Sequence, residues 1–340
     1  MDWLFKSNSA IDETAATTKR RKFFAIGLTF LIVFYISSII SVLISTVPTY
    51  AILFGDEAFM NIISENIDSD YDTIMGIVEE QLPIIIEENS SAIQMINLFT
   101  TVGTIICVLF YCIKIEKRRL FTLGFVKKGA LVEYAIGLLI GLLMFASVYG
   151  IVLLSGEAKF IGFNFDVSIG TVLLFLLGFI IQGASEEILL RGYFFVTCAA
   201  NTNVIVSILS SSVLFAALHL GNPNFSLLAF VNLFLFGVFA ALYFLRRGSI
   251  WGICALHTIW NFAQGNIFGC NVSGMPMEDT LLLTENVRGA VWSGGGFGPE
   301  GGIAVTMILF IGIVTLTFMK NKEYDGFYSV EKGEFVSDYY

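Results

Sequence analysis

Long apolar segments limit the fold of this chain more than any other feature of its sequence. About 20 consecutive apolar residues are enough to cross a bilayer as an α-helix. Eight segments of the 340-residue chain come near that length: 23–47, 92–113, 131–154, 171–197, 203–220, 225–245, 250–268 and 302–319. Because backbone in lipid must satisfy its own hydrogen bonds, the sequence predicts an all-α membrane protein, a bundle of about eight transmembrane helices.

The basic residues predict how this bundle is oriented. Residues 19–22 are all Lys or Arg, and further basic residues follow the second, sixth and eighth segments. If the segments alternate in direction, every basic group falls on one side, which the positive-inside rule assigns to the cytoplasm. Both termini are then cytoplasmic. Residues 48–91, with ten Asp or Glu and no Lys or Arg, form an acidic loop outside.

No separate soluble domain is expected, and the chain divides into five parts by topology. The net charge of −9 reflects this segregation of charge, so the expected surroundings are a lipid bilayer and no nucleic acid. The acidic loop is predicted to form short amphipathic helices on the outer face, and the glycine-rich loop 269–301 to be mobile. The five parts are a cytoplasmic segment 1–22, two helices with the acidic loop in 23–130, a membrane core 131–268, the glycine-rich loop and last helix in 269–319, and a cytoplasmic tail 320–340.

Ionisable residues inside these apolar segments are the clearest functional signal. The only two histidines, His219 and His257, lie in the fifth and seventh segments, and the fourth carries Glu186, Glu187 and Arg191. A charge at the bilayer centre costs roughly 2.5–3.5 kcal/mol on insertion scales, so such groups must face one another or water. The sequence therefore predicts a polar active site within the membrane.

Helical spacing suggests which of these groups act together. Glu187 and Arg191 are four residues apart and can form an ion pair. Glu186 is turned by about 100° from Glu187, so it stays available for another neighbour. A salt bridge that only locks two helices together would also explain the pair, but it leaves Glu186 without a role.

The two histidines have neighbours at the same spacing. His257 and Asn261 share one helical face, as do Phe215 and His219, with Phe215 expected to be a packing wall. A Glu beside an imidazole can hold and deprotonate water, and an imidazole with an Asn can stabilise the oxyanion of an amide under attack. Either histidine alone could instead be a packing residue.

A zinc site is compatible with the same residues. Glu186, His219 and His257 have the donor types of a zinc shell with one open position. The HExxH spacing typical of many zinc proteases is absent. A Zn²⁺ ion is therefore allowed by the sequence but not required.

Three short motifs carry a resemblance to a known family. EEILLRG at 186–192 resembles EExxxR, FAALH at 215–219 resembles FxxxH, and HTIWN at 257–261 resembles HxxxN. In this order they are typical of the CPBP family (CAAX protease and bacteriocin-processing, also called Abi) of intramembrane proteases. The resemblance covers roughly 130–268.

The resemblance implies a role for each motif residue. Glu186 would be the base that activates water, assisted by His219, while His257 and Asn261 would stabilise the tetrahedral intermediate. Glu187 and Arg191 would support the site or bind substrate. The family is described as metalloproteases, yet a metal-independent glutamate mechanism is also proposed for its prenyl-protein members, so Zn²⁺ stays open.

The expected function is hydrolysis of a peptide bond in a membrane-associated protein or peptide, in a bacterial plasma membrane. Bacterial members resembling this chain act in peptide maturation, bacteriocin immunity or signalling. One alternative is a non-catalytic immunity or scaffold protein that binds a peptide or a sensor kinase. Another is a transporter with Glu186 and the histidines as a proton relay, although no repeat relates the two halves of the chain.

Helix lengths add a geometric condition on the site. Glu186 lies roughly 22 Å along the fourth segment and His219 roughly 24 Å along the fifth, at about 1.5 Å per residue. Two antiparallel helices of equal depth would then place them near opposite surfaces. The fourth helix must therefore reach about 197–200, and the fifth must begin below the membrane or stop short, with the GNPN turn at 221–224 inside the bundle.

Overall fold

The molecule is a nearly all-α membrane bundle, and the computed structural model describes residues 6–322. Each of the eight predicted segments is helical. Five helices of the described chain are long and apolar enough to cross a membrane: Phe23–Gly55, Ser90–Ile115, Ala130–Ser155, Ile169–Asn201 and Leu227–Arg247. The other three predicted segments form shorter helices.

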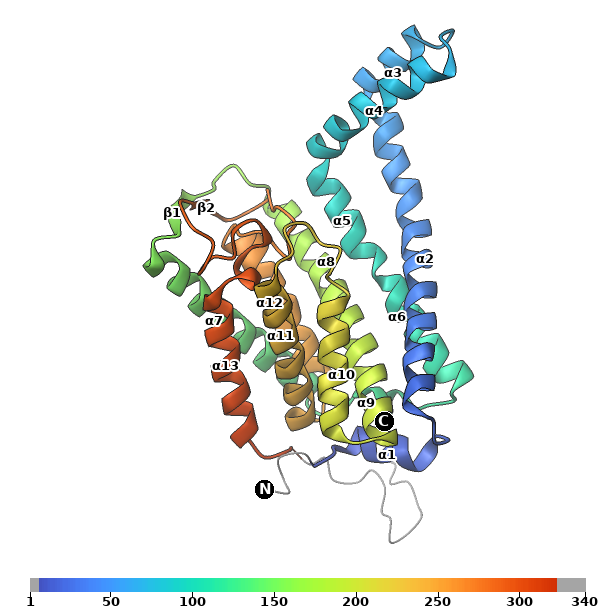
Figure 1. The fold of residues 1–340 in the computed structure, drawn as a ribbon, viewed down its shortest axis with the longest axis vertical. Helices are drawn as coiled ribbons and strands as arrows, with labels where there is room; N and C mark the ends of the chain where they lie inside the picture. Colours follow the sequence, from blue (N-terminus) through green and yellow to red (C-terminus); the bar gives the residue numbers. More distant parts are fainter. Residues whose placement is uncertain (1–5, 323–340) are drawn as a thin grey trace.

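The N-terminal part forms a long arm beside the rest of the bundle (Figure 1). Its first long helix, α2, is 33 residues long and so includes the first eight residues of the predicted acidic loop. The ten acidic residues of this loop lie on or next to α3 and α4, which stand at the far end of the arm rather than on the outer face of the bundle. The elements of this part are α1 (Ser9–Thr17), α2 (Phe23–Gly55), α3 (Glu57–Glu65), α4 (Tyr71–Glu88), α5 (Ser90–Thr100), α6 (Val102–Phe110), η1 (Tyr111–Ile115) and η2 (Leu120–Leu123).

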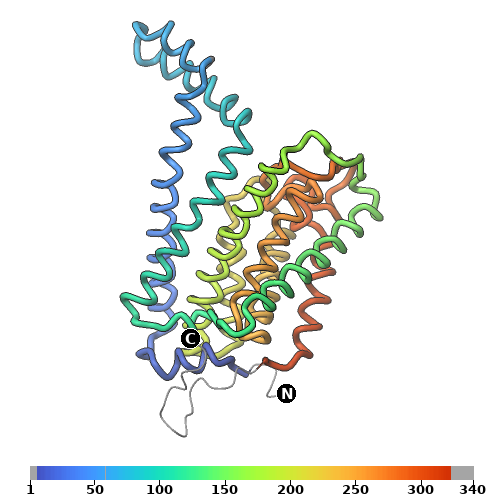
Figure 2. The backbone as a smooth tube through the Cα atoms, turned by 180° about the vertical axis from the view of Figure 1, so that it is seen from behind, coloured from blue at the N-terminus to red at the C-terminus, as the bar shows by residue number. Residues whose placement is uncertain are grey.

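The remaining helices form the core. Their bounds are α7 (Ala130–Ser155), α8 (Ile169–Glu187), η3 (Ile188–Phe195), α9 (Val196–Asn201), α10 (Val204–Ala217), α11 (Leu227–Arg247), α12 (Ile250–Phe262), η4 (Ala263–Ile267) and α13 (Ile303–Phe318). Seen from behind, α7 crosses the bundle obliquely (Figure 2). Two glycines allow its close approach to α12, because a Cβ on Gly137 would lie 2.0 Å from the Gly252 carbonyl oxygen and one on Gly141 would lie 2.7 Å from that of Leu256.

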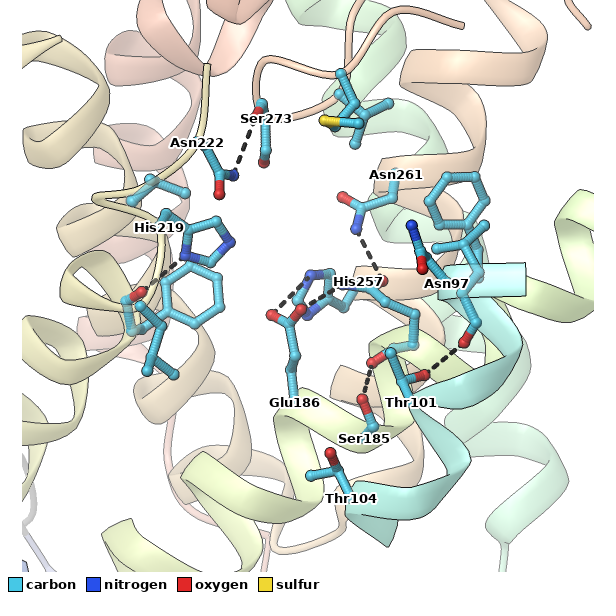
Figure 3. Close-up of a pocket in the computed structure, with 18 of the residues that line it drawn as sticks. Asn97, Thr101, Thr104, Ser185, Glu186, His219, Asn222, His257, Asn261 and Ser273 are labelled. Carbon is cyan, nitrogen blue, oxygen red and sulfur yellow. Dashed lines mark hydrogen bonds and ion pairs between the residues drawn. The ribbon is translucent and has the colours of Figure 1, made fainter. Parts of the chain in front are cut away.

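The helix lengths meet the geometric condition set by the sequence. The fourth segment is one continuous helix from α8 through the π-helical stretch η3 to the end of α9, so Glu186 lies near its middle. The fifth, α10, has only 14 residues and ends at Ala217. His219 therefore lies in the non-helical turn that follows, at the level of Glu186 rather than at the opposite surface (Figure 3).

A folded cover closes one end of the core. In this cover, residues 269–301, β2 (Leu282–Asn286) pairs antiparallel with β1 (Ala158–Phe163). Two short 3₁₀ turns follow, η5 (Gly295–Phe297) and η6 (Pro299–Gly301). This glycine-rich segment therefore contains regular secondary structure that the sequence did not predict, and its mobility stays a prediction. One of its glycines is required by packing, since a Cβ on Gly294 would lie 1.9 Å from the Gly298 carbonyl oxygen.

Single carboxylates hold the cover in place. The Glu157 carboxylate, at the end of α7, accepts hydrogen bonds from the backbone N–H groups of Trp292 (2.8 Å) and Ser293 (2.9 Å). The Glu300 carboxylate likewise accepts from the N–H and hydroxyl of Ser273, both at 2.7 Å. Burial by itself raises the pKa of Glu157, but these backbone donors outweigh it and hold the pKa below its ordinary value.

Residues 19–22, which are all basic, follow α1 at the opposite end of the molecule from the arm tip (Figure 1). There Arg247 and Lys322 both donate to the buried Glu133 carboxylate, each with an N–O distance of 2.8 Å. Arg118 is buried and donates to the Thr197 hydroxyl at 2.8 Å. The segregation of charge expected from the sequence is thus present in the fold. Of the predicted tail 320–340, residues 323–340 lie outside the part of the chain that the structure describes.

Candidate active site

Residues of the three motifs surround one cavity of about 580 Å³ within the bundle. Glu186 comes from α8, His219 from the turn after α10, and His257 with Asn261 from α12; all four line the cavity (Figure 3). Phe215 lines it as well. The structure thus brings together in one place the side chains that the sequence placed on three separate helices.

Glu187 and Arg191 lie behind this cavity wall, with both side chains fully buried. Arg191 Nη1 donates to Glu187 Oε1 at 3.0 Å, which confirms the predicted ion pair. The same oxygen accepts a hydrogen bond from His257 Nδ1–H at 2.9 Å. Glu187 therefore has a second partner that the helical spacing alone did not show.

The bond to Glu187 fixes the orientation of the His257 ring. Since a carboxylate oxygen only accepts, Nδ1 must carry the proton of this bond. The other nitrogen, Nε2, is then directed toward the cavity and lies 3.9 Å from Glu186 Oε2. A carboxylate that orients an imidazole and stabilises its protonated form is a common arrangement in hydrolases.

Aromatic rings hold the two imidazoles apart. The Phe215 ring lies 4.9 Å from that of His219 and 5.9 Å from that of His257, and the Arg191 guanidinium is 4.8 Å from the Phe215 centroid. Phe236 lies 5.0 Å from the His257 ring. Phe215 thus packs between the buried ion pair and His219, in the packing role expected from the sequence.

His219 faces Glu186 across the cavity (Figure 3). Its Nδ1–H donates to the Phe215 carbonyl oxygen at 2.8 Å, which leaves the lone pair of Nε2 for the cavity. Asn222 in the same turn donates to the Ser273 carbonyl oxygen of the cover at 2.9 Å. The position of His219 therefore depends on both the end of α10 and the folded cover.

Sequence reasoning missed Gln182, which joins two of the predicted residues. Its Nε2 donates to Glu186 Oε1, and its Oε1 accepts a hydrogen bond of 3.1 Å from Asn261 Nδ2. Gln182 precedes Glu186 by four residues, so the spacing that indicated the Glu187–Arg191 pair could have indicated this one too. Close approach of the two helices is possible because a Cβ on Gly183 would lie 2.9 Å from the Thr258 nitrogen.

One oxygen of the Glu186 carboxylate remains unsatisfied beside the cavity. Within residues 6–322, Glu186 Oε2 is buried and accepts no hydrogen bond. An unsatisfied carboxylate oxygen in a low-dielectric site is costly unless a water or a ligand donates to it. This oxygen is therefore available to a water molecule in the cavity.

The predicted zinc ligands do not form a metal-binding group as they are arranged. Across the described residues, no three His, Cys, Asp or Glu side chains are grouped closely enough to hold a metal ion. Glu187, the other carboxylate nearby, is already bonded to Arg191 and His257. A chelation experiment tests the ion directly.

Comparison with known proteins agrees with the motifs. Residues 168–263 match the family described as Type II CAAX prenyl endopeptidase Rce1-like. This segment runs from the start of α8 to the end of α12 and contains all three motifs. Neither the curated proteins nor the solved structures contain a match.

The fold and the site define a class of protein, an integral membrane helical bundle with ionisable side chains in a cavity among its helices. Residues 168–263, which contain the three motifs, match a CAAX protease family, as the resemblance predicted. The similarity of this segment supports a CAAX-type protease at the level of the family.

Proposed function

We propose that this chain is an intramembrane endopeptidase that hydrolyses a peptide bond of a membrane-associated protein or peptide. One observation carries the proposal. The unsatisfied Oε2 of Glu186 and the Nε2 lone pair of His219 face one cavity from opposite sides. A water between them would have two acceptors for its protons, as water activation requires.

The reaction begins with this water. Glu186 takes a proton from the water as the water oxygen bonds to the carbonyl carbon of the scissile amide, and the carbonyl π electrons move to its oxygen. When the tetrahedral intermediate collapses, the C–N bond breaks and its electrons leave with nitrogen. Glu186 returns the proton to that nitrogen, and His219 accepts and releases protons from the opposite side.

Asn261 and His257 serve the oxyanion in this proposal. Asn261 Nδ2 uses one N–H for Gln182 and has a second for the substrate oxygen. His257 Nε2 faces the same region, and the carboxylate of Glu187 stabilises the ring when it is protonated. Donors fixed in advance around a developing charge are among the largest contributions to such reactions.

The substrate class follows from the surroundings of the site. The cavity lies among apolar helices, so a substrate must enter from the bilayer or from its surface. The matched family name refers to prenylated CAAX proteins. For this chain we propose a membrane-associated peptide or protein in a bacterial plasma membrane, with no prenyl group required.

Replacing the proposed base tests this function. Glu186→Gln keeps the shape of the side chain and removes the anion, so cleavage should fall by about 10²–10⁴-fold while yield and folding are retained. The measurement is a comparison of new peptide N-termini in membranes from cells with the parent or the variant, with Glu79→Gln on the exposed arm as the matched control. Identical N-termini at parental rates in the Glu186→Gln strain would refute the proposal. If the protein is only a binding scaffold, the Glu186→Gln variant should rescue a deletion strain as well as the parent does.

Chelation tests the metal in the same assay. A metal-independent reaction should survive incubation with a strong chelator without loss of rate. If activity disappears and returns on addition of Zn²⁺, Glu186 and the histidines bind a metal and the water is activated by that ion.

The orientation in the membrane is part of the proposal. The basic end near α1 and Arg247 should face the cytoplasm, with the acidic arm tip outside. A cysteine introduced at Glu79 should react with a membrane-impermeant maleimide added to intact cells. One introduced at Lys19 should react only after lysis. The opposite result would reverse the topology.

A further inference from the structure

Four polar residues form a stripe on the arm side of the cavity, outside the segment that the family shares. Gln94, Asn97, Thr101 and Thr104 recur at intervals of three and four along α5 and α6, so they share one helical face. All four line the cavity that holds Glu186. We call them the α5–α6 stripe.

The stripe is held firmly next to the catalytic helix. Both α5 and α6 pack against α8, and a Cβ on Gly178 of α8 would lie 3.0 Å from the Leu98 Cβ. Figure 3 shows Thr101 and Thr104 beside Ser185, with Asn97 on the side of Asn261. A ligand along the stripe would therefore pass both the proposed base and the proposed oxyanion donor.

Internal hydrogen bonds leave the stripe rich in acceptors. Gln94 Nε2 donates to the Pro276 carbonyl oxygen at 2.7 Å, and the Thr101 hydroxyl donates to the Leu98 carbonyl oxygen at 2.6 Å. The side-chain oxygens of both residues keep lone pairs. Within the described part of the chain, no hydrogen bond engages the side chains of Asn97 or Thr104. The Asn97 amide and the Thr104 hydroxyl can donate as well as accept, so a ligand that satisfies the whole stripe carries both hydrogen-bond donors and acceptors and needs no charge.

An extended peptide backbone has this chemistry. A lipid ester offers acceptors only, and a peptide in an α-helix has already used its N–H groups. The stripe spans eleven residues, 94–104, a rise of roughly 15 Å, which matches four or five residues of extended chain. The cavity lining also includes Leu189, Leu233 and Phe236, which suit hydrophobic side chains.

We propose that the α5–α6 stripe is a binding site for an unwound, uncharged peptide segment, whose backbone N–H groups it accepts beside Glu186. This inference rests on the proposed endopeptidase function and adds the part of the molecule that selects and extends the substrate. A segment leaving its helix in a membrane loses its internal hydrogen bonds, and the stripe replaces them.

A binding experiment with paired peptides tests the stripe separately from cleavage. The probe is a fluorescein-labelled heptapeptide in which two glycines alternate with leucine and alanine. Its twin has sarcosine at both glycines and so lacks those N–H groups. Full-length Glu186→Gln protein in phosphatidylcholine nanodiscs prevents turnover. We expect it to bind the glycine peptide about 10-fold more tightly than the twin, from two hydrogen bonds of ordinary strength.

Matched variants test whether the stripe causes the preference for the glycine peptide. Asn97→Leu combined with Thr104→Val should reduce the preference to about threefold or less, because two acceptors remain. Thr100→Val, on the same helix but outside the cavity lining, should leave it unchanged. Absence of binding, absence of a preference, or an unchanged preference in the double variant would each overturn the proposal.

The two proposals can fail separately. Cleavage in membranes that depends on Glu186 but is unchanged by the double variant would refute the stripe and leave the protease. A stripe-dependent preference together with Glu186-independent N-termini would leave a peptide-binding protein without the proposed chemistry.

Discussion

Charged side chains are placed differently in two parts of the molecule, the core around α8 and α12 and the arm that carries α3 and α4. In the core, Glu187 is fully buried and bonded to both Arg191 and His257. On the arm, carboxylates such as Glu79 and Glu80 are exposed to solvent. The family match covers α8 to α12 of the core and does not include the arm. The buried charges of the core are paired with one another, while those of the arm are solvated.

The largest effect should come from breaking the buried pair of the core. Glu187→Gln or Arg191→Met leaves the partner charge buried and uncompensated, which costs roughly 3–5 kcal/mol. We expect low yield and a strongly lowered melting temperature in detergent for both variants. Parental melting behaviour in both would show that the pair does not stabilise the core.

The next effect compares two amides on opposite walls of the same cavity. Asn261→Ala should reduce the cleavage rate by about 10²–10³-fold through loss of an oxyanion donor. Asn97→Leu on the arm side should reduce it by no more than about 10-fold, since it removes one substrate hydrogen bond. Rate constants for one substrate with both variants check this, and equal losses would erase the proposed distinction between catalysis and binding.

A smaller effect is expected where the cover meets α7. Glu157→Gln removes the charge from a group that accepts several backbone N–H bonds, a loss of about 1–3 kcal/mol. Because the folded pKa of Glu157 is depressed, its contribution is complete above the unfolded pKa of about 4.3 and is lost as the pH falls through the folded value. Melting curves between pH 3 and 6 should show less acid destabilisation in the variant than in the parent. Parallel curves would contradict this role.

The smallest effect should come from the arm itself. Glu79→Gln with Glu80→Gln changes two exposed side chains, and surface substitutions of this kind are close to neutral. The melting temperature should move by less than about 2 °C. A larger shift would mean that the arm packs against something in the membrane and that its charges are not solvated.

Much of the core could be predicted because its signals are local. A residue pair four apart on a helix meets whatever the rest of the fold does, so the Glu187–Arg191 pair followed from spacing. The long fourth helix and short fifth helix followed from the need to bring Glu186 and His219 to one depth. The second partner of Glu187 could not be predicted, since it depends on how α12 docks against α8.

The sequence by itself determined the membrane bundle, the segregation of charge and the set of motif residues, because apolar length, charge position and helical spacing act along the chain. Only the tertiary structure decided the folded cover, the bridge through Gln182 and the polar stripe on α5 and α6. In the cover, Glu157 meets Trp292 and Ser293, more than a hundred residues away in the sequence. Contacts of this kind depend on the packing of whole helices, which no local pattern specifies.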